Sequence, residues 1–102
     1  MIIATRIYIV NAENREQVIA EMSKEARIAR QVPGIFTHSF YADVDDPTVI
    51  RFYGEFENVE ALEAQIKSQH KGRFKEAMAK LGVTLAPGTV SAYTAVPEYP
   101  FK

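Results

Sequence analysis

Two histidines, His38 and His70, are the side chains of this chain best suited to acid–base chemistry. An imidazole titrates near neutral pH, so it can take a proton from a phenol or an enol under working conditions. Burial would lower its pKa and keep it in the neutral form that a base requires. We therefore take His38 as the candidate base. His70 would hydrogen-bond the developing oxyanion, and Thr5 would be a second polar partner.

Both histidines also have a structural interpretation. His70 lies on a stripe of apolar residues at helical spacing, which consists of Leu62, Ile66, Phe74, Met78 and Leu81. A histidine on such a stripe can pack in a core with its ring bonded to a backbone carbonyl. A shift of one residue in strand register would move His38 to the opposite face of its sheet. The pattern leaves catalytic and structural roles open for both residues.

The residue types favour neither a metal site nor a cofactor. The chain has no cysteine, which excludes disulfides, thiolate nucleophiles and thiolate ligands. Two histidines make a weak metal site, and no third ligand has a suitable spacing. Asp43, Asp45 and Asp46 form an acidic cluster, but calcium loops need more ligands at fixed offsets. We expect a solvated hairpin turn there instead.

Length and charge limit the class of protein. The 102 residues predict a single domain over residues 1–102. The net charge of −1, without a basic block, argues against nucleic acid binding. No apolar run is long enough to span a membrane, and the first residues lack the order of a signal peptide. We expect a cytoplasmic protein with no membrane or nucleic acid partner.

The hydrophobic pattern predicts the order strand, helix, strand, strand, helix, strand. The strands are expected at residues 2–10, 35–43, 49–57 and 89–96. The helices are expected at residues 14–32, 59–66 and, resuming, 68–81. This order predicts an α+β fold of the ferredoxin-like, split βαβ type, whose helices cover one face of a four-stranded antiparallel sheet. Residues 97–102 are expected to form an extended tail.

Alternation within the strands assigns side chains to the two faces of the sheet. The face toward the helices is predicted to hold Ile3, Thr5, Ile7, Ile9, Phe36, His38, Phe40, Ile50, Phe52 and Phe56. Aromatic side chains around a few polar groups suit a flat aromatic ligand. The predicted walls of that substrate site are Phe36, Phe40, Phe52, Phe56 and, from the second helix, Phe74.

The other face is predicted to carry Arg6, Tyr8, Val10, Ile35, Tyr41, Val49, Arg51 and Tyr53. This set is too apolar and aromatic for a simple solvent face. Two such sheets packed face to face would make a homodimer with two-fold symmetry. The same face could instead bind another protein.

The chain resembles the antibiotic biosynthesis monooxygenase (ABM) domain family of the dimeric α+β barrel superfamily. The matching pieces follow one another along most of the chain. They are Arg6-Ile7, Pro33-Gly34-Ile35-Phe36, residues 41–47, residues 52–57 leading into 59–64, and the Ser-x-His-x-x-x-Phe pattern of Ser68, His70 and Phe74.

The resemblance implies a homodimer with a ligand site between the sheet and the helices of each subunit. Some family members oxidise phenolic or quinol-type compounds with O2 and use no flavin, haem or metal. Haem-degrading relatives carry an Asn, a Trp and a His where this chain has Thr5, Gln65 and Met78, so haem degradation is disfavoured. The Trp of the polyketide-oxidising members is also absent.

These observations predict a cofactor-independent monooxygenase acting on a small aromatic, quinol or enolic substrate. One alternative is a ligand-binding dimer without catalytic activity, in which both histidines are structural. Another is an oxygen-independent isomerase or degrading enzyme for a small oxygenated metabolite.

Overall fold

Runs of β-branched and aromatic residues form the three long strands β1 (Ile2–Ile9), β2 (Ile35–Ala42) and β3 (Val49–Phe56). In the computed structural model, which describes residues 1–95, β3 pairs antiparallel with both β1 and β2. Two short strands, β4 (Thr84–Leu85) and β5 (Ser91–Thr94), pair antiparallel with β1. The order β2-β3-β1-β4, with β5 also beside β1, is that of the predicted ferredoxin-like α+β fold.

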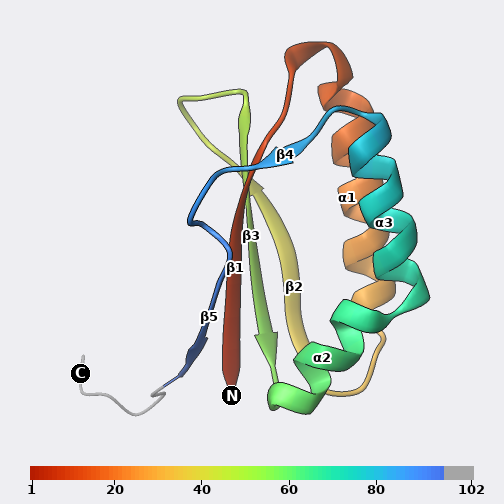
Figure 1. Ribbon diagram of the computed structural model, residues 1–102, viewed down its shortest axis with the longest axis vertical. Helices are drawn as coiled ribbons and strands as arrows, with labels where there is room; N and C mark the ends of the chain where they lie inside the picture. Colours follow the sequence, from red (N-terminus) through yellow and green to blue (C-terminus); the bar gives the residue numbers. More distant parts are fainter. Residues whose placement is uncertain (96–102) are drawn as a thin grey trace.

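Three helices lie on one side of the sheet (Figure 1). They are α1 (Arg15–Ala29), α2 (Val59–Lys67) and α3 (Gln69–Lys80). The helical spacing of Val18, Met22, Ala26, Ala29 and Val32 predicts one apolar face for α1, and the first four of these residues are buried. Asn14 and Gln17 have the spacing of a capping box, and Asn14 is the N-cap residue of α1, but its side chain makes no capping hydrogen bond. A 3-10 turn (Ala12–Asn14) comes first, and the side chain of Asn11 accepts the hydrogen bond from the Asn14 N–H.

Ser68 divides the second helical region into α2 and α3. Its extended backbone ends α2, and its hydroxyl accepts a hydrogen bond from the Lys71 N–H at the start of α3. The same hydroxyl donates to the Gln65 carbonyl at 2.8 Å. This single serine therefore both ends α2 and caps the first turn of α3, the turn that carries Lys71.

The predicted faces of β1 are wrong. Ala4, Tyr8 and Val10 lie in the core, whereas Ile9 is exposed. Thr5 and Ile7 border a depression on the opposite face of the sheet. Both faces of this strand are apolar, and the Tyr8 ring packs against Phe40 and Phe74. Because the Tyr8 ring fills the space under the helices, the face of β1 that carries Tyr8 turns inward. This orientation is the reverse of the predicted one.

One prediction on β2 is also wrong. The pairing with β3 shifts between Ile35 and Thr37, as at a β-bulge. Ile35 is buried, and Phe36 is 59% exposed. Beyond the bulge His38 faces the core as predicted, and on β3 Phe52 and Phe56 do so as well.

The C-terminal segment differs from its predicted single strand at residues 89–96. It forms the two short strands β4 and β5, and Gly88 between them has a positive φ of 75°. The predicted tail, residues 97–102, lies outside the described residues. Within residues 1–95 no helix is both long and apolar enough to cross a membrane.

Candidate functional site

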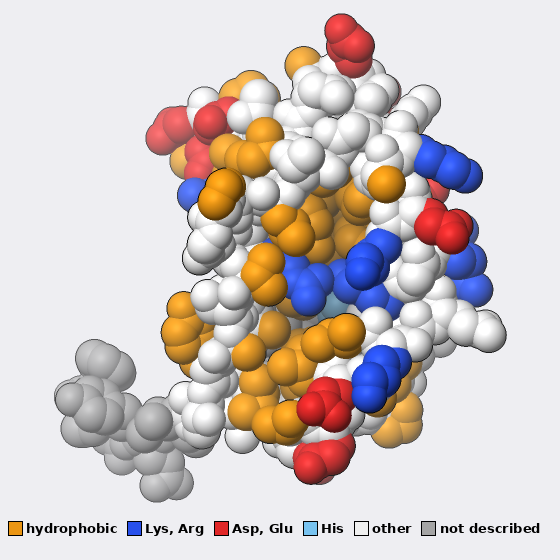
Figure 2. Space-filling model, in the orientation of Figure 1, with side chains coloured by type: hydrophobic (Ala, Val, Ile, Leu, Met, Phe, Trp, Pro, Cys, Tyr) orange, Lys and Arg blue, Asp and Glu red, His pale blue; other side chains and the backbone are white. Residues whose placement is uncertain are grey.

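A cavity of about 310 Å³ lies between β1, α3 and the segment that carries β4. We call it the Arg6–Lys71 cavity after the two cations that line it. Its apolar lining includes Phe74, Met78 and Val83. Figure 2 shows Lys and Arg side chains gathered in a hollow that hydrophobic side chains surround. A volume near the lower end of the usual range for ligand sites suits a small molecule.

Arg6 and Tyr8 reach this cavity from β1. They are two residues apart, so both side chains point to the helix side of the sheet. Tyr8 is only 5% exposed. Burial raises the pKa of its hydroxyl, although the neighbouring Arg6 guanidinium opposes that rise. Tyr8 therefore stays a neutral hydrogen-bond donor at working pH. Arg6 makes no ion pair with any described residue.

Lys71 enters the cavity from the first turn of α3. It is only 7% exposed, and its Nζ lies 5.0 Å from the centre of the Phe74 ring. Burial, reinforced by the positive charges of Arg6 and Lys75, lowers the pKa of Lys71 to about 8, although Glu25 acts in the opposite direction. No carboxylate of residues 1–95 forms an ion pair with it. A buried ammonium group without a counter-ion is costly, which makes Lys71 a candidate functional residue.

His38 lies inside a cluster of aromatic rings and does not line the cavity itself. Its ring centre is 4.5 Å from that of Phe52 and 5.8 Å from that of Phe40. Only 3% of the residue is exposed, and Nδ1 has no hydrogen-bond partner within residues 1–95. Burial, assisted chiefly by the charge of Lys71, lowers the pKa of His38 to about 3. The imidazole is therefore neutral, as predicted for a base, but it is a weak proton acceptor.

His70 takes part in a polar network between helices. Its Nδ1 lies 2.9 Å and 3.1 Å from the two carboxylate oxygens of Glu25 on α1. Gln65 of α2 donates from Nε2 to Glu25 Oε2 at 3.0 Å. Glu25 is 3% exposed, so these bonds satisfy a carboxylate that has little access to water. The arrangement supports the structural interpretation of His70, with a carboxylate partner in place of the expected carbonyl.

The predicted wall residues divide into two groups. Phe40, Phe52, Phe56 and Phe74 belong to the core beneath the helices, and of these Phe74 lines the cavity itself. Thr5 lies on the opposite face of the sheet because the orientation of β1 is reversed. Phe36 is exposed because of the bulge in β2. Whether any of these side chains contacts a substrate remains a prediction.

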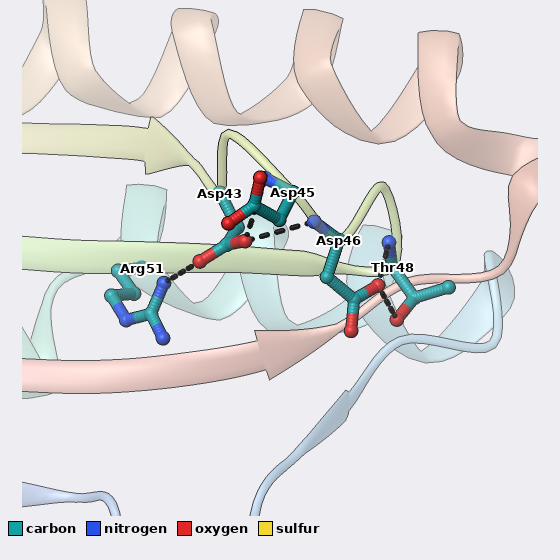
Figure 3. A network of polar contacts seen from close by, with 5 residues as sticks. All are labelled: Asp43, Asp45, Asp46, Thr48 and Arg51. Carbon is teal, nitrogen blue, oxygen red and sulfur yellow. Dashed lines mark hydrogen bonds and ion pairs between the residues drawn. The ribbon is translucent and has the colours of Figure 1, made fainter.

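The acidic cluster forms the predicted hairpin turn between β2 and β3 (Figure 3). Asp43 pairs with Arg51 and accepts hydrogen bonds from the N–H groups of Asp45 and Asp46. Asp46 accepts hydrogen bonds from the N–H and hydroxyl groups of Thr48. These bonds hold the pKa values of Asp43 and Asp46 below the ordinary range. Within residues 1–95, no three His, Cys, Asp or Glu side chains are grouped to hold a metal ion.

Comparison with protein families gives one match. The model for antibiotic biosynthesis monooxygenases fits residues 1–80, which is most of the chain. The protein belongs to the ABM family. The predicted resemblance is thereby confirmed.

Solved structures agree with this assignment at the level of the fold. A Deinococcus radiodurans protein named for antibiotic biosynthesis monooxygenases superposes with a TM-score of 0.87 at 21% identity, covering 94% of this chain and 93% of its own. A Nitrosomonas europaea protein of the same designation gives a TM-score of 0.81 at 16% identity, covering 94% and 99%. A conserved Methanosarcina mazei protein gives a TM-score of 0.79 at 15% identity, covering 90% and 89%. No curated protein matches the chain.

Three side chains of the cavity in this ABM protein were missed by the sequence patterns. Alternation along residues 2–10 predicts the outer face for Arg6 and Tyr8. A solvated helix face is predicted for the charged set that includes Lys71, namely Lys67, Lys71, Arg73, Lys75 and Lys80. A signal for Lys71 does exist, because it precedes Phe74 by three residues and Met78 by seven and so shares their helix face. A charged residue at such a position can bury its stem and carry its ammonium group into a cavity.

Proposed function

We propose that this ABM-family protein is a cofactor-independent monooxygenase that oxidises a small aromatic, quinol or enolic compound in the Arg6–Lys71 cavity. The observation that carries the proposal is the cavity itself: a neutral phenol and two cations that form no ion pair within residues 1–95, in a mostly apolar lining. Such a lining would bury a flat ring and stabilise negative charge on its oxygen. The names of the structural relatives support the same class of reaction.

The proposed reaction needs only the substrate and O2. An anthrone-type substrate loses a methylene proton to solvent, and its anion gives one electron to O2. The two radicals combine to form a peroxide at the methylene carbon, and the peroxide takes a proton back from solvent. Loss of water from the peroxide leaves a carbonyl group. One oxygen atom enters the product and the other leaves as water, so the methylene group supplies all of the electrons and both of the hydrogens.

Each side chain has a different role in this proposal. The cations lower the energy of the substrate anion, since its charge develops next to them in a low-dielectric site. The Tyr8 hydroxyl donates a hydrogen bond to the same oxygen. His38 contributes a neutral polar group at the edge of the aromatic cluster. With its pKa at about 3, His38 would accept a phenol's proton only at a large free-energy cost.

Oxygen uptake by the purified protein tests the proposal. A panel of hydroquinones and anthrone-type compounds should give uptake above the rate measured without protein. Tyr8→Phe, which keeps the ring, should lower the rate about tenfold or more because the oxyanion loses a donor. His38→Ala and His70→Ala test the predicted catalytic roles. Compounds that bind but never drive uptake would contradict the proposal and favour the ligand-binding or isomerase alternatives.

We also propose that the outer face of the sheet joins two copies of the chain. This face presents Ile3, Ile7, Tyr41 and Tyr53, and Tyr41 and Tyr93 are more than half exposed. The reversal of β1 turns three of its isoleucines toward this face, which makes it more apolar than the sequence predicted. Self-association would remove that apolar surface from water.

A further inference from the structure

The Arg6–Lys71 cavity contains an excess of positive charge. Arg6, Lys71 and Lys75 all line it, and no Asp or Glu within residues 1–95 does. Glu25 acts on Lys71 from α1, but His70 and Gln65 already bind its carboxylate oxygens. The charge on Lys71 is therefore uncompensated inside the described part of the protein.

Lys71 is more than nine-tenths buried, which makes this charge costly. Its contact with the Phe74 ring returns only part of that cost, since a cation over an aromatic face contributes about 2 kcal/mol at most when desolvated. Arg6, in the same cavity, repels it. An anion placed between the two side chains would reverse both unfavourable effects.

We propose that the Arg6–Lys71 cavity binds small organic anions, with an acid oxygen held between Lys71 and Arg6 and an aromatic body against Phe74 and Met78. The acid oxygen belongs to a carboxylate or to an ionised phenol or enol. This inference deepens the proposed function, on which it rests, by naming the charge of the substrate. It predicts that a compound of the same shape that cannot ionise binds more weakly.

Isothermal titration with three naphthalenes of similar shape tests the charge requirement: 1-naphthoate, 1-naphthol and neutral 1-naphthamide. Naphthoate should bind about tenfold or more tightly than naphthamide, since a charge-assisted hydrogen bond contributes more than a neutral one. The naphthol result separates the two acids near pH 7, where Lys71 keeps its charge: naphthol affinity above that of naphthamide would assign the site to phenols that ionise on binding as well as to carboxylates. Equal affinity for naphthoate and naphthamide would overturn the proposal, as would no naphthoate binding at millimolar concentration.

Substitutions test which groups hold the anion. Lys71→Met keeps the length of the side chain and removes its charge, so naphthoate should bind about tenfold or more weakly. Arg6→Gln should do the same, and Lys71→Arg should keep most of the affinity. Lys67→Met is the matched control, because Lys67 is exposed and outside the cavity, and it should bind like the wild type. Wild-type affinity in Lys71→Met, with folding verified by circular dichroism, would contradict the proposal.

A pH series adds a readout that a purely structural lysine would not change. The charged and titratable groups around Lys71 are Arg6 and Tyr8 of β1, Glu25 of α1, His38 of β2 and Lys75 of α3. Since the pKa of Lys71 is lowered to about 8, naphthoate affinity should fall as the pH rises from near 7 to near 10. Lys71→Arg should abolish that fall, and an unchanged fall in this variant would count against the assignment.

The binding experiment and the oxygen-uptake experiment test the two proposals independently. Charge-selective binding without oxygen uptake on any panel member would keep this inference and remove the monooxygenase proposal. Uptake from a neutral substrate at an equal rate in wild type and Lys71→Met would keep the monooxygenase proposal and remove this inference.

Discussion

At the scale of single residues, the burial of His38 makes the stability of the folded protein depend on pH. In the folded protein the pKa of His38 is about 3, whereas in the unfolded chain it has the ordinary value of 6.5. Because the folded value is the lower one, the stability linked to His38 is complete above pH 6.5 and is lost as the pH falls toward 3. The complete loss is about 5 kcal/mol.

Urea unfolding of wild type and His38→Leu at two pH values measures this contribution. Between about pH 7 and pH 4.5 the wild type should lose about 3 kcal/mol more stability than the variant. Carboxylates of low pKa, such as Asp43, titrate in both proteins and cancel in the difference. The same pH dependence in both proteins would contradict the burial of a neutral imidazole.

A second residue-scale prediction concerns the pair of His70 and Glu25. His70→Ala leaves the buried Glu25 carboxylate with only the Gln65 amide, so we expect a loss of about 3 kcal/mol in the free energy of unfolding. His70→Gln retains a donor at a similar distance and should lose less. Urea titration near pH 7 compares them. If the two variants were equally stable, the hydrogen bond to Glu25 would have no measurable value.

At the scale of secondary structure, Ser68 is the critical position. Ser68→Ala removes the cap of α3 and should cost about 1 kcal/mol, whereas Ser68→Asp restores an acceptor for the Lys71 N–H and should recover most of that loss. Thermal unfolding of the three proteins measures the differences. Since Lys71 lies in the capped turn, naphthoate binding should weaken in Ser68→Ala more than in Ser68→Asp. Equal stability of the alanine and aspartate variants would show that the cap is unimportant.

The elements also show what the sequence could predict. The period of the apolar residues identified the buried stripe of α1 and the core face of β3, because in each only one face is apolar. On β1 both faces are apolar, so alternation could not choose between the Ile3 face and the Tyr8 face. On β2 a bulge changes the register near Phe36, and alternation carries no signal for a bulge.

The residues of the candidate site could be predicted only in part, because alternation and helical spacing do not show how strands and helices pack together. His38 stood out because a polar ring interrupts an apolar strand, and its burial is confirmed. The patterns predict the outer dimer face for Arg6 and a solvated helix face for Lys71, since most charged residues lie at the surface of a subunit. The burial of these two residues depends on which strand face turns inward and on how α3, which begins after Ser68, packs over the sheet. Those are tertiary properties that a local pattern does not contain.

At the scale of the whole molecule, light scattering tests the proposed pairing of outer sheet faces. The protein should have twice the 11.5 kDa mass of one chain at micromolar concentration. Ile7→Glu places a charge in the centre of that face and should give a monomer. Val59→Glu is the control, because Val59 is half exposed on α2, away from that face. A wild-type monomer would contradict the pairing.

The central claim is that the chain inserts one atom of O2 into its substrate. Mass spectrometry of the product formed from anthrone under ¹⁸O2 tests it most directly. We predict a product that carries a single ¹⁸O atom, with the second atom released as water, and a yield that falls in Tyr8→Phe and Lys71→Met. A product that forms without the label, or a yield no greater than in protein-free buffer, would contradict the account.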